Sequence, residues 1–255
     1  MPVRLCYHTD PACPASWAAE PVLRRLLVEF GADLSITYVM GGLAREYEAP
    51  YEPRVREWLR LADRSGMPFD PLLWTEGPIR STYPACIAVK AAAEQGAEAG
   101  GRYLRVLREG LMCFRRKLDA KEALVEEARG AGLEVERFRI DLDSHAILEA
   151  FGADLEARRA HARELPFFVV GDDEIVCGPG DELRAAVLAA GARPSGEPRP
   201  DVLAALRSFG RMATAEVEAV CDLPGPRANA ELWRLASDWR VKPIRVLTGT
   251  LWEAV

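Results

Sequence analysis

The chain begins with a strand-like segment, a helix and a second strand-like segment, in that order. Residues 3–7 read as a short buried strand, and residues 17–30 carry apolar side chains at helical spacing. Gly31 ends this helix, and residues 34–39 alternate apolar with polar side chains and are rich in β-formers. This order predicts a βαβ unit whose two strands lie parallel in one sheet. The fold class that follows is α/β.

A cysteine stands at the point where the first strand gives way to the helix. Cys13 is followed by Pro14, which fits the first helical position. The N–H groups of a first turn lack partners and the helix dipole is positive there, so we expect a lowered pKa for the Cys13 thiol. A redox pair would place a second cysteine three residues on, where this chain has Ser16. The pattern predicts an attacking thiol without a resolving one.

The middle of the chain is helical, and strands return after it. Helical periodicity with glycine and proline breakers over about 51–160 predicts an all-helical insertion. Leu165 and Pro166 then introduce a β-hairpin that ends at Cys177, and a helix follows over 181–190. Residues 1–190 are therefore expected to form one domain.

A proline-rich stretch at 191–200 predicts a linker to a smaller unit. Residues 201–255 read as three helices and a hairpin that turns at 248–250, which is typical of a winged-helix module. From Gly196 onward, eight basic residues stand against eight acidic ones, so the basic excess of a duplex-binding protein is missing. We expect this module, with its candidate recognition helix at 227–240, to contact protein or to pack within the chain, and not to bind nucleic acid.

Charge and hydropathy narrow the class of protein further. A net charge of −6 disfavours bulk attraction to nucleic acid or to an anionic membrane. No apolar run approaches the roughly 18 residues that suggest a membrane span. The first residues do not read as a secretory leader, and six cysteines lie scattered without a CxxC pair. We therefore expect a cytoplasmic protein with reduced thiols.

His8, Asp10 and Cys13 bring three kinds of metal ligand close together. The Asp10-Pro11 pair is equally explained by turn chemistry, so we predict no metal site. His8 remains a candidate partner that tunes the pKa of Cys13. Among the aromatic residues, Trp17 and Trp74 are candidates to line a peptide groove beside the thiol.

Three segments in this order resemble a known family. They are residues 10–14 (DPACP), 38–43 (YVMGGL) and 165–169 (LPFFV). Over about 3–190 the chain resembles the DsbA-like branch of the thioredoxin fold, in particular the cytoplasmic FrnE-type proteins. The resemblance implies a thioredoxin-like fold interrupted by the helical insertion, and the winged-helix-like module follows this fold in the chain.

The resemblance also implies roles for individual residues. Cys13 would be the nucleophile and Pro166 a cis-proline whose backbone pairs with bound peptide. Leu165 would contact the substrate before it, with Pro14 and Trp17 as further substrate contacts. Ser16 would either donate a hydrogen bond to the Cys13 thiolate or serve only to satisfy a backbone group at the helix start.

These features predict a thiol-disulfide oxidoreductase that acts through Cys13 alone on a protein or peptide client. A second thiol must then release the mixed disulfide, and glutathione is the candidate co-substrate. No bound cofactor is expected. Two alternatives stay open: a non-catalytic adaptor that holds a protein in the thioredoxin-fold groove, and an enzyme similar to the kappa-class glutathione transferases and isomerases.

Overall fold

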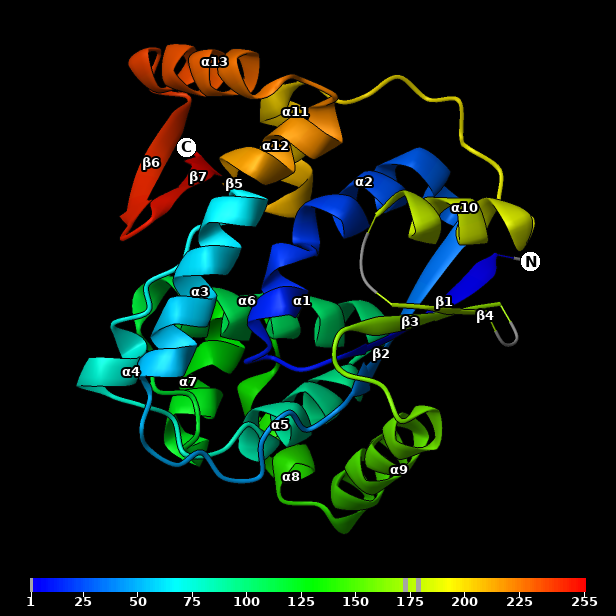
Figure 1. The fold of residues 1–255 in the computed structure, drawn as a ribbon, viewed down its shortest axis with the longest axis vertical. Coiled ribbons are helices and arrows are strands. Elements are labelled where there is room, and N and C mark those ends of the chain that lie inside the picture. The colour runs from blue at the N-terminus through cyan, green and yellow to red at the C-terminus, as the bar shows by residue number, and fades with distance from the viewer. Residues whose placement is uncertain (1, 172–173, 178–179) are drawn as a thin grey trace.

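The computed structural model of this chain describes residues 2–171, 174–177 and 180–255 (Figure 1). Its main sheet has the strand order β2-β1-β3-β4. The strands are β1 (Val3–Thr9), β2 (Leu34–Met40), β3 (Phe167–Val170) and β4 (Glu174–Val176). β1 is parallel to β2 and antiparallel to β3, and β3 is antiparallel to β4. The predicted α/β class and the predicted βαβ unit are confirmed.

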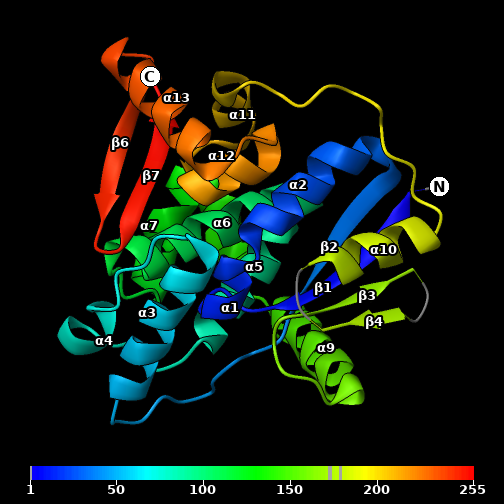
Figure 2. The ribbon, with the colours of Figure 1, turned by 45° about the horizontal axis from the view of Figure 1, so that its top comes forward.

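The first helical segment is broken in two. It consists of α1 (Pro14–Ala18) and α2 (Glu20–Phe30), and a 3-10 turn, η1 (Gly31–Asp33), leads into β2. α2 packs on one face of the sheet beside α10 (Asp181–Ala189), as Figure 2 shows. Their apolar side chains meet those of β1 and β3 in a core that includes Leu5, Tyr7 and Phe168. This core holds the start of α1 at the end of β1.

The helical insertion is confirmed, and it lies between β2 and β3 in the chain. Its helices are α3 (Glu52–Ser65), α4 (Leu73–Glu76), α5 (Tyr83–Ala93), α6 (Ala97–Phe114), α7 (Lys121–Gly130), α8 (Val135–Leu142) and α9 (His145–His161). A break at residues 143–144 separates α8 from α9. Ser144 causes it, because its hydroxyl accepts a hydrogen bond from the Ile147 N–H at 3.3 Å and caps a new helix.

The C-terminal module, residues 201–255, has the three predicted helices and the predicted hairpin. Its elements are α11 (Val202–Phe209), β5 (Met212–Ala213), α12 (Thr214–Cys221), α13 (Gly225–Ser237), β6 (Val241–Val246) and β7 (Gly249–Ala254). The strands form an antiparallel sheet in the order β5-β7-β6. Val246 pairs with Gly249, so the hairpin turns one residue earlier than predicted. The winged-helix assignment and the domain boundaries stay predictions.

The module is docked on the rest of the chain through buried charges. Glu216 of α12 is fully buried and accepts two hydrogen bonds from Arg105 of α6, at 2.8 and 3.0 Å. The Nε atom of Arg24 on α2 lies 2.9 Å from the same carboxylate. Glu20 and Glu109 also pair with Arg105. We call these five residues the charge cluster, and it joins three parts of the chain.

Among the helices that the structure describes, none is both long and apolar enough to cross a membrane.

Candidate site around Cys13

Cys13 lies between the end of β1 and the loop before β3. It is the N-cap of α1, and its sulfur accepts a hydrogen bond from the Ser16 N–H at 3.4 Å. The Cys13 Sγ atom also lies 3.8 Å from the carbonyl oxygen of Leu165. The Leu165–Pro166 peptide bond is cis, as the resemblance implies. Residues more than 150 positions apart in the sequence are thus brought together by the sheet.

The environment of the thiol differs from the expected one. Cys13 is only 2% exposed, and burial raises the pKa of its thiol, an effect to which the Asp10 carboxylate adds. Hydrogen bonds from Ser16 and the charge of Arg108 oppose the rise in the pKa without cancelling it. The expectation of an acidic thiol is therefore wrong. α1 has five residues, so few peptide dipoles add up at its N-terminus.

We expect Cys13 to react slowly with alkylating agents at pH 7, because both its burial and its raised thiol pKa reduce the accessible thiolate. Cys177 is exposed and serves as an internal reference. Iodoacetamide labelling followed by mass spectrometry of the two peptides should show Cys13 reacting at least roughly tenfold more slowly. Equal rates would contradict this prediction.

Ser16 is also buried, and its hydroxyl accepts a hydrogen bond from Thr9 Oγ1 at 2.8 Å. Its backbone N–H and its hydroxyl both favour the Cys13 thiolate. Of the two contacts considered for the Ser16 hydroxyl, the one to the thiol is present, whereas among the described residues its other partner is the Thr9 side chain and not a backbone group of the helix start. A catalytic role for Ser16 and Cys13 stays a prediction.

Trp17 does not line a groove, and this part of the prediction is wrong. Its side chain has no exposed surface, and its indole N–H donates to the Pro68 carbonyl at 2.9 Å. The guanidinium of Arg105 lies 4.4 Å from the centre of its ring. α1 turns Trp17 inward, so it anchors the site helix to the insertion.

A pocket of about 260 Å³ opens beside Cys13. Pro14 and Leu165 line it, as predicted for substrate contacts, although their role stays a prediction. Trp74 lines it as well, together with Tyr47 and Arg54 from the chain between β2 and α4. The guanidinium of Arg54 lies 4.0 Å above the Tyr47 ring. Neither Tyr47, in the irregular segment after β2, nor Arg54, in the first turn of α3, was predicted as a site residue, because no local pattern shows which residues of a distant segment reach the thiol.

Asp10 organises the loops around the thiol. Its buried carboxylate accepts hydrogen bonds from the N–H groups of Ala12 and Leu43, at 2.8 and 2.6 Å. Thr82 Oγ1 donates to it at 2.8 Å and Cys86 Sγ at 3.2 Å. Burial raises the pKa of Asp10 in spite of these bonds. The interpretation of Asp10 as a turn residue is therefore supported, with the addition that it ties the turn to the insertion.

None of the other cysteines is bonded to Cys13 in the part of the chain that the structure describes. All six cysteines are free thiols. The sulfur of Cys86 is held by Asp10, and that of Cys113 lies 3.4 Å from the Pro68 carbonyl. Burial raises the thiol pKa of both. The site therefore has a single sulfur at its centre.

His8 faces away from the thiol. Its ring stacks on Phe167 with centroids 4.1 Å apart, and the ring of His161 lies 5.3 Å away. Burial lowers the pKa of His8 to about 4, and the nearby His161 adds to the shift. In the described residues His8 makes no hydrogen bond to Cys13. It is therefore a core histidine and not the partner that tunes the thiol.

Stability should fall as the pH is lowered because of His8. The unfolded chain takes up a proton near pH 6.5, while the folded protein keeps His8 neutral down to about pH 4. The folded state binds fewer protons, so stability present above pH 6.5 is lost on acidification, by up to about 3 kcal/mol. Urea unfolding at several pH values measures this loss. A His8→Phe variant should show a shallower fall between pH 7 and 5, and an unchanged profile would contradict the assignment.

The fold and the site together define a class. A cysteine at the start of the first helix, facing a cis-proline loop across the end of β1, is the arrangement of a thioredoxin-fold protein. Residues 7–178 match the family model described as thioredoxin, and the chain belongs to this family.

Among solved structures, the protein is similar to a candidate protein disulfide isomerase from Nitrosomonas europaea. The TM-score is 0.67 at 20% identity, over 74% of this chain and 97% of that one. It is also similar to the cytosolic disulfide reductase DsbM from Pseudomonas aeruginosa, solved with GSH. There the TM-score is 0.61 at 20% identity, over 73% and 98% of the two chains. The predicted resemblance to the DsbA-like branch is confirmed at the level of the fold.

Among curated relatives, the ClpXP adapter protein SpxH from Halalkalibacterium halodurans is 30% identical to this chain. The similarity extends over 99% of this chain and 89% of the adapter.

Proposed function

We propose that this protein is an adapter that brings client proteins to the ClpXP protease. The observation that carries the proposal is the span of the similarity. The ClpXP adapter of H. halodurans matches 99% of the chain, whereas the isomerase and reductase structures match 74% and 73%. The similarity to the adapter therefore extends over the C-terminal module, and disulfide exchange at Cys13 has no evident use for that module.

The environment of Cys13 supports an adapter more than a catalyst. Thiol exchange is fastest when the attacking sulfur is accessible and a good part of it is ionised. Cys13 is buried with a raised thiol pKa, and Ser16 stands where a resolving cysteine would be. Each of these features disfavours turnover. None of these features would reduce the ability of the protein to bind a client.

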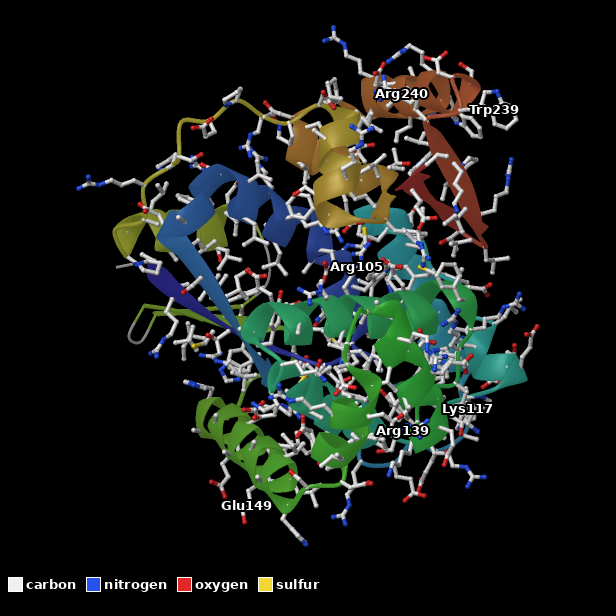
Figure 3. All side chains as sticks on the ribbon, turned by 180° about the vertical axis from the view of Figure 1, so that it is seen from behind. Arg105, Lys117, Arg139, Glu149, Trp239 and Arg240 are labelled. Carbon is white, nitrogen blue, oxygen red and sulfur yellow. The ribbon has the colours of Figure 1, made fainter. Side chains whose placement is uncertain are left out.

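The C-terminal module offers a surface suited to binding protein. Trp239, just beyond α13, is 86% exposed, and Trp233 of α13 is 47% exposed. Figure 3 shows Trp239 and Arg240 at the outer end of the module. Exposed tryptophan and arginine side chains are typical of the energetic centres of protein interfaces. We propose that a client or the protease contacts this surface.

Reconstituted degradation tests the adapter proposal. Candidate clients are proteins that accumulate both when this chain is absent and when ClpXP is absent. With purified ClpXP, addition of the chain should accelerate degradation of such a client roughly tenfold or more. Clients whose degradation is unchanged by the chain would contradict the proposal.

Three variants sharpen this test. Trp239 has a left-handed backbone with φ 58°, so asparagine is the substitution that keeps its conformation. Trp239→Asn should reduce client degradation. Ile140→Asn on α8 removes an exposed apolar side chain, 72% exposed, from a distant face and should have no effect. Cys13→Ser should also leave degradation unchanged, because no thiol step is involved.

Thiol exchange remains a second candidate function, since the Cys13 sulfur borders the pocket and faces the cis-proline loop. In this reaction the Cys13 thiolate attacks the peptide sulfur of a glutathionylated peptide and displaces glutathione. A glutathione then attacks the Cys13 sulfur of the mixed disulfide and frees the peptide thiol, and a further glutathione removes the one left on Cys13 as oxidised glutathione. Incubation of the protein with such a peptide should then release glutathione. If the Cys13→Ser variant releases glutathione at the same rate as the unchanged protein, thiol exchange at Cys13 is excluded as a function.

A further inference from the structure

β2 forms one edge of the main sheet (Figure 2). Because β2 pairs on one side only, half of its backbone groups point away from the sheet. In a parallel ladder, every second residue turns both its N–H and its C=O towards the neighbouring strand. The Gly41 N–H reaches β1 at the Thr9 carbonyl, 2.7 Å away. The Met40 N–H instead turns outward and donates to Asp154 of α9 at 2.8 Å. Every second residue before Met40 shares this outward direction.

Within β2 those residues are Leu34, Ile36 and Tyr38, and the Leu34 N–H already donates to the Gly31 carbonyl. Among the described residues their outward N–H and C=O groups have no partner strand, because β2 pairs with β1 alone. Asp154 covers the edge only at Met40. The intervening Thr37 is exposed. An open edge of this kind is a template for one more strand.

A cleft with a volume of about 960 Å³ runs along this edge. Apolar side chains of α2 and α6 line it, among them Leu23, Leu27 and Leu104. The C-terminal module closes its far side with Phe209 and Arg211. Side chains of an added strand would alternate between this apolar lining and solvent.

The position of the edge within the cleft and one exposed arginine, Arg102, indicate which strand fits, and Glu98 and Glu253 line the same cleft. A second copy of the protein would present an edge lying in its own cleft, so two such edges could not approach to the roughly 4.8 Å of a strand pair. A single extended peptide can approach the β2 edge to this distance. Arg102 lines the cleft with 56% of its side chain exposed, and its carboxylate partner, Glu98, is 4.0 Å away and almost fully exposed. An acidic residue on the peptide would give Arg102 a closer partner.

We propose that the β2 edge binds an extended, acidic segment of a client as an additional strand, with alternate apolar side chains on the cleft lining. This inference rests on the proposed function for the identity of the partner. The strand site itself is separate from the Cys13 pocket and from the exposed end of α13. The cleft would therefore bind the client segment without any part played by the Cys13 thiol.

Amide exchange tests the strand site directly. The probe is an acetylated and amidated heptapeptide in which valine alternates with threonine and the last residue is aspartate. At millimolar peptide, the Ile36 and Tyr38 amides should exchange at least tenfold more slowly, while Thr37, already bonded to β1, should not change. Absence of protection, or protection confined to residues around Cys13 or on α13, would overturn the proposal.

Two sets of controls keep the result interpretable. Methylating the amide nitrogens of the peptide residues whose N–H groups face β2 should abolish protection. Methylating those of the alternate residues, whose N–H groups face away from β2, should preserve it. Ile36→Lys should weaken binding by placing a charge at the edge, and Ile36→Pro should abolish it by removing an outward N–H while leaving the β1 ladder intact. Circular dichroism of both variants checks folding, and the methylated peptides test the site without altering the protein. Strand binding without accelerated ClpXP degradation would contradict the adapter proposal alone.

Discussion

Replacing Glu216 with alanine is expected to lower the free energy of unfolding by about 3–5 kcal/mol. The Glu216 carboxylate is fully buried and neutralises Arg24 and Arg105, and it also accepts a hydrogen bond from the Ala213 N–H at 2.7 Å. Its removal leaves two buried cations with less compensation and one backbone donor without a partner. Urea unfolding followed by circular dichroism measures the loss.

An exposed ion pair supplies the control for this variant. Glu231 and Arg234 on α13 lie 2.7 Å apart on the surface, and Glu231→Ala should leave the unfolding transition in place, because solvent screens such pairs. A loss below about 1 kcal/mol for Glu216→Ala would show that the charge cluster does not hold the module. A separate early transition in the variant would instead indicate that only the module is released.

Replacing Trp17 with alanine is expected to cost about 3–5 kcal/mol, the range for a buried aromatic residue. The side chain has no exposed surface, donates to the Pro68 carbonyl and lies beneath Arg105. The truncation therefore leaves a cavity, a Pro68 carbonyl that keeps only its contact with Cys113 Sγ, and an Arg105 guanidinium without its aromatic neighbour. Thermal and urea unfolding should both report the destabilisation.

The matched control is Trp239→Asn, because Trp239 is 86% exposed, its removal leaves no cavity, and asparagine tolerates the left-handed backbone at this position. Its effect on the unfolding free energy should be within about 0.5 kcal/mol. If Trp17→Ala is equally mild, Trp17 does not anchor α1 and its assignment to the core must be abandoned.

Glu216 and Trp17, the residues changed in these two predictions, both contact Arg105 and so belong to one connected set of buried side chains. The Ser16 hydroxyl binds Thr9, and Thr9 in turn is bound by Arg108 of α6. Arg108 also binds Glu20, which belongs to the charge cluster at the C-terminal module. Because these side chains are buried and each is bonded to the next, the module and the Cys13 site share one scaffold.

Much of the fold could be predicted from the sequence, because it depends on local periodicity. The βαβ start, the helical insertion, the hairpin after Pro166 and the three C-terminal helices follow from patterns a few residues long, and the structure confirms them. The pairing of Cys13 with a cis peptide before Pro166 was reached through the resemblance, and it too is present.

The thiol pKa of Cys13 and the direction in which Trp17 points could not be predicted from local periodicity. The start of a helix lowers a thiol pKa when solvent or cations surround it, but here burial raises the pKa of Cys13. Whether Trp17 faces a groove or the core depends on which helix packs over it, and that helix is α6. Neither fact is visible in a sequence window.

The sequence by itself determined the order of strands and helices, the position of the cysteine at a helix start and the absence of its redox partner. Only the tertiary structure decided how deeply that cysteine is buried, which charges join the module to the scaffold, and which strand edge stays open. The physical reason is that periodicity and capping are local, whereas desolvation, ion pairing and edge exposure depend on segments that are distant in the chain.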